Sequence, residues 1–181
     1  MATKSQNAKN GNDAIALLKA DHDKVKKMFR QFEQLHENED DDEAEAIATQ
    51  ICNELTIHAT VEEEIFYPAV RAAIDEEDLM DEAEVEHQSA KDLIEQIQSE
   101  GSAGDKFAAK VMVLGEYINH HVEEEQNEIF PKAKKAKLDM NELGEQIMAR
   151  KQELKAELGM EDEAQEEEEQ PARSGRSRRA A

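Results

Sequence analysis

Hydrophobic side chains recur every three or four residues along most of this chain, the spacing that places them on one face of an α-helix. Four such stripes follow one another, over residues 15–35, 47–65, 80–97 and 107–129. A shorter stripe over residues 143–158 predicts a fifth helix packed on the outside. The pattern therefore predicts an all-α protein, an up-down-up-down four-helix bundle with a short additional C-terminal helix.

Breaks in this pattern divide the chain into four parts. Residues 1–11 are polar and are expected to be disordered, and residues 12–137 hold the bundle. Residues 138–159 form the additional helix. Residues 160–181 are acidic at first and then rich in arginine, and this tail is also expected to be disordered because it cannot bury apolar surface.

Two features predict irregularities within the bundle. The acidic run 37–42 should end the first helix and supply an aspartate N-cap for the second. Pro68 lies where the helical pattern continues on both sides, so we expect a kink there and not necessarily a stop.

Four of the six histidines occupy stripe positions where leucine or isoleucine is usual, namely His22, His58, His87 and His121. Two of them are followed four residues later by a glutamate, Glu62 or Glu125, so each imidazole and carboxylate share one helix face. Burying such pairs costs several kcal/mol unless something compensates them. A metal ion is the usual compensator, and these six residues are the predicted ligands.

An internal repeat supports a single site. His22 precedes His58 by 36 residues, His87 precedes His121 by 34, and each second histidine begins the motif His-x3-Glu-x5-Pro. Each half is therefore a helical hairpin with the same motif. At about 1.5 Å per residue, antiparallel neighbours bring all four histidines to one depth in the bundle core.

Other polar residues fit the site less well. His120 points about 100° away from His121 around the helix, although it is the main rival ligand there. His36 lies about 21 Å along the helix from His22, too far to share a metal ion. Tyr117 is expected to pack at the edge of the core. Solvated faces are expected for the neighbouring glutamates, Glu63, Glu64, Glu123 and Glu124.

Six nitrogen and oxygen ligands on facing helices suit a pair of non-haem iron ions, with manganese as a substitute. Calcium and magnesium prefer all-oxygen cages, and structural zinc needs only four ligands, usually thiolates. The glutamates would bridge the ions and leave open positions for O2, NO or peroxide. The ferritin-like alternative needs Glu-x-x-His on two helices, and of the four candidate histidines only His87 has a glutamate, Glu84, at that spacing.

Composition limits the partners. A net charge of −22 argues against nucleic acid, because phosphate binding needs a basic surface. The single Cys52 cannot form an internal disulfide and is expected to be a small buried residue. A polar N-terminus and the lack of any apolar run near 18 residues predict no secretory signal and no membrane span, hence a cytoplasmic location. The tail arginines could contact an acidic protein partner, although a solvated tail is favoured.

The order His, His-x3-Glu, His, His-x3-Glu resembles the hemerythrin-like, or HHE cation-binding, family over about residues 12–137. The segments Leu18-Lys-Ala-Asp-His22 and Phe66-Tyr-Pro68 resemble it in detail. The resemblance implies an up-down-up-down bundle with a di-iron centre held by the same six ligands. In oxygen-carrying members a second histidine follows the third-helix ligand by one turn, where this chain has Lys91. The site should therefore be a more symmetric one of four histidines and two glutamates.

This departure shifts the expected function away from reversible oxygen carriage. The leading hypothesis is a di-iron protein that binds or responds to O2, NO or peroxide and has no organic substrate. One alternative is a di-iron peroxidase or catalase-like enzyme, so turnover stays open. Another is a protein-interaction module whose bundle is ordered by iron or oxygen binding.

Overall fold

A computed structural model describes residues 13–160 of the chain. These residues contain helices and turns but no strand. The elements are α1 (Ala14–Glu37), α2 (Asp41–Val61), η1 (Glu62–Phe66), α3 (Tyr67–Ala73), α4 (Glu77–Glu100), α5 (Phe107–Glu124), η2 (Glu125–Ile129), α6 (Phe130–Lys135) and α7 (Met140–Glu157). The two predicted disordered tails fall almost wholly outside the described residues.

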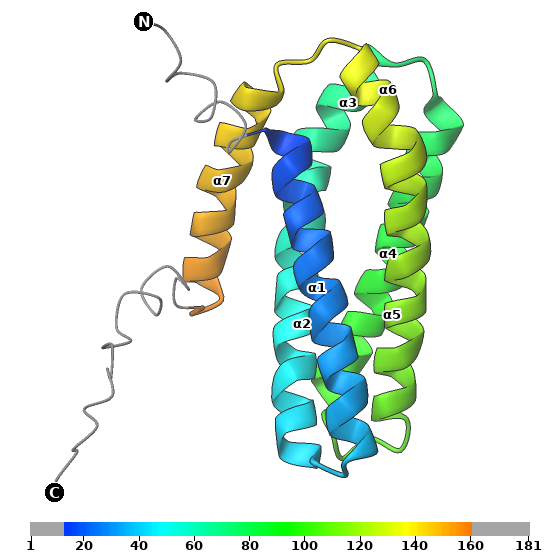
Figure 1. Cartoon of the computed structure of the whole chain (residues 1–181), viewed down its shortest axis with the longest axis vertical. Coiled ribbons are helices and arrows are strands. Elements are labelled where there is room, and N and C mark those ends of the chain that lie inside the picture. Colours follow the sequence, from blue (N-terminus) through cyan, green and yellow to red (C-terminus); the bar gives the residue numbers. More distant parts are fainter. Residues whose placement is uncertain (1–12, 161–181) are drawn as a thin grey trace, which may run out of the picture.

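Four long helices, α1, α2, α4 and α5, run antiparallel to their chain neighbours in an up-down-up-down bundle (Figure 1). The short helices α3 and α6 continue α2 and α5 at one end of the bundle. Helix α7 lies outside, against α1 and α2. The predicted all-α fold, including the additional C-terminal helix, is confirmed. None of the helices in residues 13–160 is both long and apolar enough to cross a membrane.

Each hairpin's second helix contains a π-helical turn that ends two residues before a proline. The turns η1 and η2 precede Pro68 and Pro131, and each closes with a hydrogen bond to a carbonyl five residues back, from Tyr67 N–H to Glu62 in η1. Proline has no N–H and its ring clashes with the carbonyl four residues back, so a wider turn relieves both problems. The irregularity expected at Pro68 is thus a π turn that inserts one residue into the helical phase.

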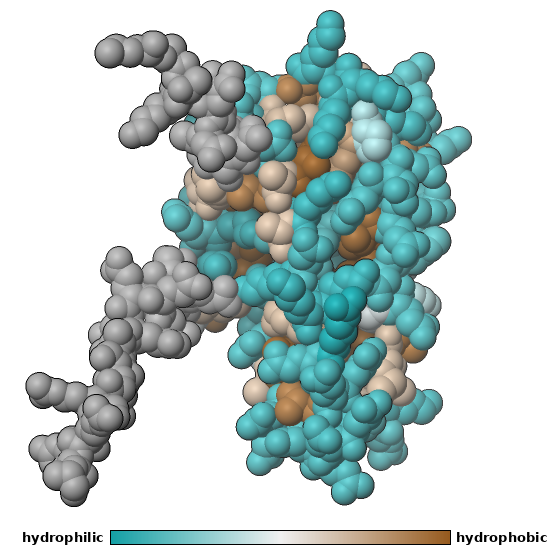
Figure 2. Space-filling model, viewed as in Figure 1, coloured by the Kyte–Doolittle hydropathy of each residue, from teal (hydrophilic) through white to brown (hydrophobic). Residues whose placement is uncertain are grey.

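The hydrophobic core consists of two clusters on either side of a polar layer. One cluster, near α3 and α6, includes Leu18, Phe66 and Ile147, the last contributed by α7. The other fills the opposite end and includes Phe32 and Ile97. The outer face seen in Figure 2 is mostly hydrophilic. The polar layer between the clusters holds the histidines and glutamates described below.

Helix ends follow the sequence in part. Asp13 caps α1 through a 3.0 Å hydrogen bond from Ala16 N–H, and Asp139 caps α7 in the same way. The acidic run ends α1 at Glu37 and supplies Asp40 as the N-cap residue of α2, as predicted, although the Asp40 side chain makes no capping hydrogen bond. The connection between α4 and α5 begins at Gly101, whose φ of 59° favours glycine.

Candidate metal centre

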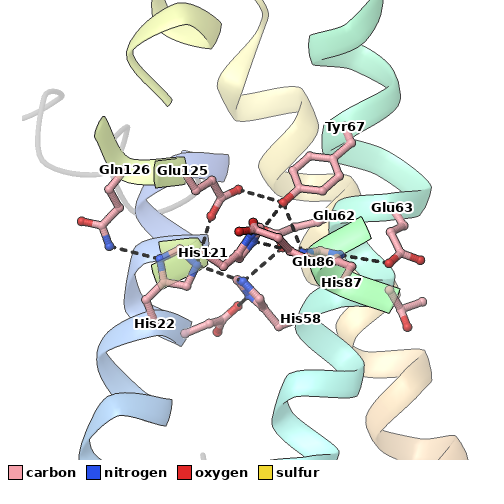
Figure 3. A network of polar contacts seen from close by, with 12 residues as sticks. His22, His58, Glu62, Glu63, Tyr67, Glu86, His87, His121, Glu125 and Gln126 are labelled. Carbon is pink, nitrogen blue, oxygen red and sulfur yellow. Dashed lines mark hydrogen bonds and ion pairs between the residues drawn. The ribbon is translucent and has the colours of Figure 1, made fainter. Parts of the chain in front are cut away.

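All six predicted ligands meet at one depth in the bundle (Figure 3). None is more than 7% exposed, and both glutamates are 0% exposed. His22 comes from α1, His87 from α4, and the two His-x3-Glu units from the ends of α2 and α5. Each glutamate is the first residue of a π turn, so the π turn begins at the very point where the carboxylate enters the core.

The first group of ligand atoms lies between α1, α2 and η2. His22 Nε2 is 3.0 Å from His58 Nε2 and 3.2 Å from Glu125 Oε2. His58 Nε2 is also 3.2 Å from Glu62 Oε2. Two nitrogens bound at about 2.1 Å to one metal ion at a right angle would lie about 3.0 Å apart, so these atoms have the separations of ligands to a shared ion.

The second group lies on the other side of Glu62. His87 Nε2 is 3.1 Å from His121 Nε2 and 3.5 Å from Glu62 Oε2. The two groups of potential ligands therefore have Glu62 in common. A carboxylate between two pairs of imidazoles has the arrangement of a bridging ligand between two ions.

Three carboxylate oxygens of this layer make no hydrogen bond to any described residue, although all are buried: Glu62 Oε1, Glu62 Oε2 and Glu125 Oε2. Their neighbours are imidazole Nε2 atoms at ion-pair distance but without hydrogen-bond geometry. Buried unpaired carboxylate oxygens are strongly unfavourable, and a cation is the partner that such oxygens and nitrogens can share. The donor set thus fits a metal centre.

A polar side chain contacts the outer nitrogen of each histidine. Asp21 lies 3.2 Å from His58 Nδ1, Glu63 2.9 Å from His87 Nδ1 and Glu86 2.7 Å from His121 Nδ1. The amide of Gln126 lies 3.1 Å from His22 Nδ1. A carboxylate at Nδ1 holds the proton there and turns the Nε2 lone pair inward, which is how histidine is prepared to bind metal.

These contacts perturb the pKa values of the groups involved. The hydrogen bond from His87 lowers the pKa of Glu63 to about 2, and that from His121 lowers the pKa of Glu86. Burial lowers the pKa of His58 to about 4, so this imidazole is neutral at pH 7 and has a lone pair to donate. Burial, followed by the charge of Glu125, raises the pKa of Glu62 well above its ordinary value.

Aromatic rings close the site toward α3 and α6. The Tyr67 hydroxyl is 3.3 Å from both His87 Nε2 and His121 Nε2, and donates to Glu125 Oε1 at 3.4 Å (Figure 3). Burial raises the pKa of Tyr67, so the phenol keeps its proton. At the equivalent position of the repeat, Phe130 stacks on His22 with centroids 6.0 Å apart.

Several neighbours of the ligands differ from expectation. Glu63 is not on a solvated face, because it bonds to His87 and to Lys91, the latter at 2.5 Å. Tyr117 is 51% exposed and is not packed at the core edge, whereas Tyr67 reaches the centre. His120 has a 65% exposed side chain outside the buried groups. The remaining neighbouring glutamates are partly or fully exposed, and Glu64 pairs with Arg150.

Sequence reasoning also missed Asp21, Glu86 and Gln126. Their positions in the internal repeat could have identified them. Asp21 and Glu86 each precede the first histidine of a hairpin, and each contacts the second histidine of that hairpin. Glu63 and Gln126 each follow the motif glutamate, and each contacts the first histidine of the other hairpin.

The chain matches the family description "Hemerythrin HHE cation binding domain" over residues 13–133, which include all six central residues. The chain belongs to the hemerythrin HHE cation-binding domain family. A hemerythrin HHE cation binding domain-containing protein from Mycobacterium kansasii has the same fold, with a TM-score of 0.68 and 24% identity over 80% of this chain and 88% of that one. Metal binding is thus a property of the family as well as an inference from the donor set.

A curated relative from Nostoc sp. (strain PCC 7120) named "DNA nickase" is 32% identical over 114 residues. The match covers 63% of this chain but only 31% of that protein. Most of the relative thus lies outside the part it shares with the hemerythrin-like chain.

Proposed function

We propose that this protein is a non-haem di-iron protein that binds or responds to O2, NO or peroxide. In this proposal the two ions are held by His22, His58, Glu62, His87, His121 and Glu125. Manganese is a substitute that the same donors accept, because imidazole and carboxylate ligands suit both metals.

One observation carries the proposal. One pair of imidazole Nε2 atoms lies on each side of Glu62. The same layer holds three buried carboxylate oxygens without hydrogen bonds. A single zinc ion would use four of these donors and would leave the others unpaired. Two ions sharing carboxylate ligands use all six residues and leave positions for a small ligand.

A cavity beside the imidazoles supports a small ligand. It has a volume of about 110 Å³ and lies between the four long helices, with His22, His58, His87 and His121 on one side. Its other walls are largely apolar and include Val25, Leu55 and Ile118. A small cavity with largely apolar walls beside the imidazoles suits small molecules such as O2 and NO.

The test is to load the purified chain with Fe2+ under anaerobic conditions, measure the iron content and record Mössbauer spectra before and after exposure to air. We expect about two iron ions per chain, a coupled pair of ions, and new near-ultraviolet charge-transfer absorption in air. His58→Ala should lose these signals, while the exposed His36→Ala should keep them. Equal iron content in the two variants would refute the proposed centre.

A second candidate is a peroxide-consuming enzyme, and Tyr67 is the observation that favours it. Its protonated hydroxyl lies within 3.4 Å of two imidazoles and a central carboxylate, so it can donate a proton or a hydrogen bond to a reactant there. Bound iron would supply the redox chemistry, whereas the tyrosine holds the proton at its phenolic oxygen.

This candidate is tested by oxygen evolution from hydrogen peroxide. If the protein is such an enzyme, Tyr67→Phe should slow the reaction about tenfold or more while leaving iron content unchanged. His58→Ala should abolish it by removing iron. Rates in the wild type no higher than those of free iron in buffer would exclude the enzyme and leave the binding function.

A further inference from the structure

We propose that Glu86, His120 and Glu124 form a second metal site, on the surface between α4 and α5, which takes up a divalent ion bound for the buried centre. His120 Nε2 lies 3.6 Å from Glu86 Oε1 and 3.5 Å from Glu124 Oε1. These contacts are longer than ordinary N–H···O hydrogen bonds. They are close to the roughly 3.4 Å between ligands bound tetrahedrally to one ion at about 2.1 Å.

The internal repeat shows that this face is unusual. In the first hairpin the positions equivalent to His120 and Glu124 are Ile57 and Val61, both 0% exposed and packed in the cluster that α7 covers. No described helix covers the same face of the second hairpin. Where the first hairpin has two aliphatic side chains, the second has a histidine and a glutamate one turn apart, the spacing of metal ligands on a helix.

Glu86 supplies an independent reason to expect a cation. Its repeat equivalent is Asp21, which bonds to His58 with one oxygen and accepts a hydrogen bond from Lys151 of α7 with the other. Glu86 likewise bonds to His121 with Oε2, as Figure 3 shows, and turns Oε1 toward His120. Among the described residues its ion pairs are with these two histidines only. A metal ion there would take the place that the lysine ammonium has in the first hairpin.

The site also lies on a path to the centre. A surface hollow of about 250 Å³ between α4 and α5 is bordered by His120 and Glu86 outside and by His87 and His121 within. The proposed central ligands are nearly inaccessible, so an ion must pass between helices to reach them. Glu86 contacts both His120 at the surface and His121 in the core, so one carboxylate links the outer site to the buried centre.

Imidazole nitrogen with two carboxylates suits Fe2+, Mn2+ or Zn2+, and the local charge favours any of them. The charges of Glu86, Glu82 and Glu128 also act on Glu124, so the surroundings of the site are acidic. Such a cluster raises the local concentration of divalent ions and speeds their capture. The exposure of the site makes it weaker than the buried centre.

The experiment compares wild type, the double variant His120→Ala/Glu124→Gln, and a control variant His36→Ala/Glu123→Gln that also removes one exposed histidine and one exposed glutamate. Glu86 is left intact because it holds His121. Mn2+ binding is counted by electron paramagnetic resonance of the free ion. The rate of Fe2+ uptake into the centre is followed anaerobically by stopped flow.

We expect wild type and control to bind one more Mn2+ ion than the double variant and to load iron roughly tenfold faster. An unchanged ion count, or an unchanged loading rate, in the double variant would overturn the inference. The uptake role rests on the proposed function, whereas the outer site does not. If the centre failed to bind metal, wild type would still bind one Mn2+ ion weakly, and the double variant would bind none. If only the outer site failed, the two central ions would remain.

Discussion

Replacing Glu62 with glutamine should stabilise the metal-free protein while abolishing its response to metal. Both Glu62 oxygens are buried without a hydrogen bond, and burial together with Glu125 raises the pKa of this carboxyl. Keeping a carboxyl with an ordinary pKa of 4.5 protonated at pH 7 costs about 3 kcal/mol, at about 1.4 kcal/mol per pH unit. Glutamine is neutral at every pH and has no such cost. We therefore expect a gain of about 1–3 kcal/mol in the free energy of unfolding, or roughly 3–10 °C in Tm.

The assay is urea and thermal denaturation in chelator between pH 4.5 and 8. Because the folded-state pKa of Glu62 is raised, its contribution to stability is intact below the unfolded pKa and is lost as the pH rises above it. The advantage of Glu62→Gln should therefore grow with pH and vanish near pH 4.5. Glu54→Gln is the control, since Glu54 is buried but pairs with Lys24 at 3.0 Å. It should destabilise the protein and keep the Tm increase caused by Fe2+ or Mn2+.

A Glu62→Gln protein no more stable than wild type at pH 7 in chelator would refute this reasoning. So would an advantage that is the same at pH 4.5 and pH 8, because the effect would then not come from the ionisation of this carboxyl.

Three further outcomes follow from the structure. Lys151→Met should reduce the metal-induced Tm increase, because Lys151 holds the carboxylate that orients His58, whereas Lys155→Met on the same helix should not. Cys52 is buried with its pKa raised to about 12, so iodoacetamide at pH 8 should alkylate it only after denaturation, as mass spectrometry would show. Gly101→Ala should cost about 1–2 kcal/mol in urea unfolding without altering metal content, because φ at Gly101 is 59° and the site is remote.

The fold and the six central residues could be predicted from the sequence because both depend on helical periodicity. A histidine in an apolar stripe, such as His22 or His87, must point where its apolar neighbours point. The repeat then predicted that the histidines of the two hairpins lie at the same depth, whatever the packing of the helices. The prediction used only spacing along each helix and the rise per residue.

The surrounding contacts could not be predicted in this way, because each joins residues on different helices. Asp21 is next to His22 in sequence but contacts His58, and its partner Lys151 comes from a helix outside the bundle. Tyr67 was missed for another reason. The π turn before Pro68 shifts the helical phase by one residue, so the expected stripe residue Ile65 is only half-buried, while Tyr67 is buried.

The residues around the six central side chains are less symmetric than the four-histidine, two-glutamate site that Lys91 suggested. The central donors repeat faithfully, but the second pair of histidines has Glu63 and Tyr67 where the first has Gln126 and Phe130. Carboxylates at both Nδ1 atoms make the second pair of imidazoles the stronger donors to a cation. Two ions held by these two groups would thus differ in charge environment and in hydrogen bonding.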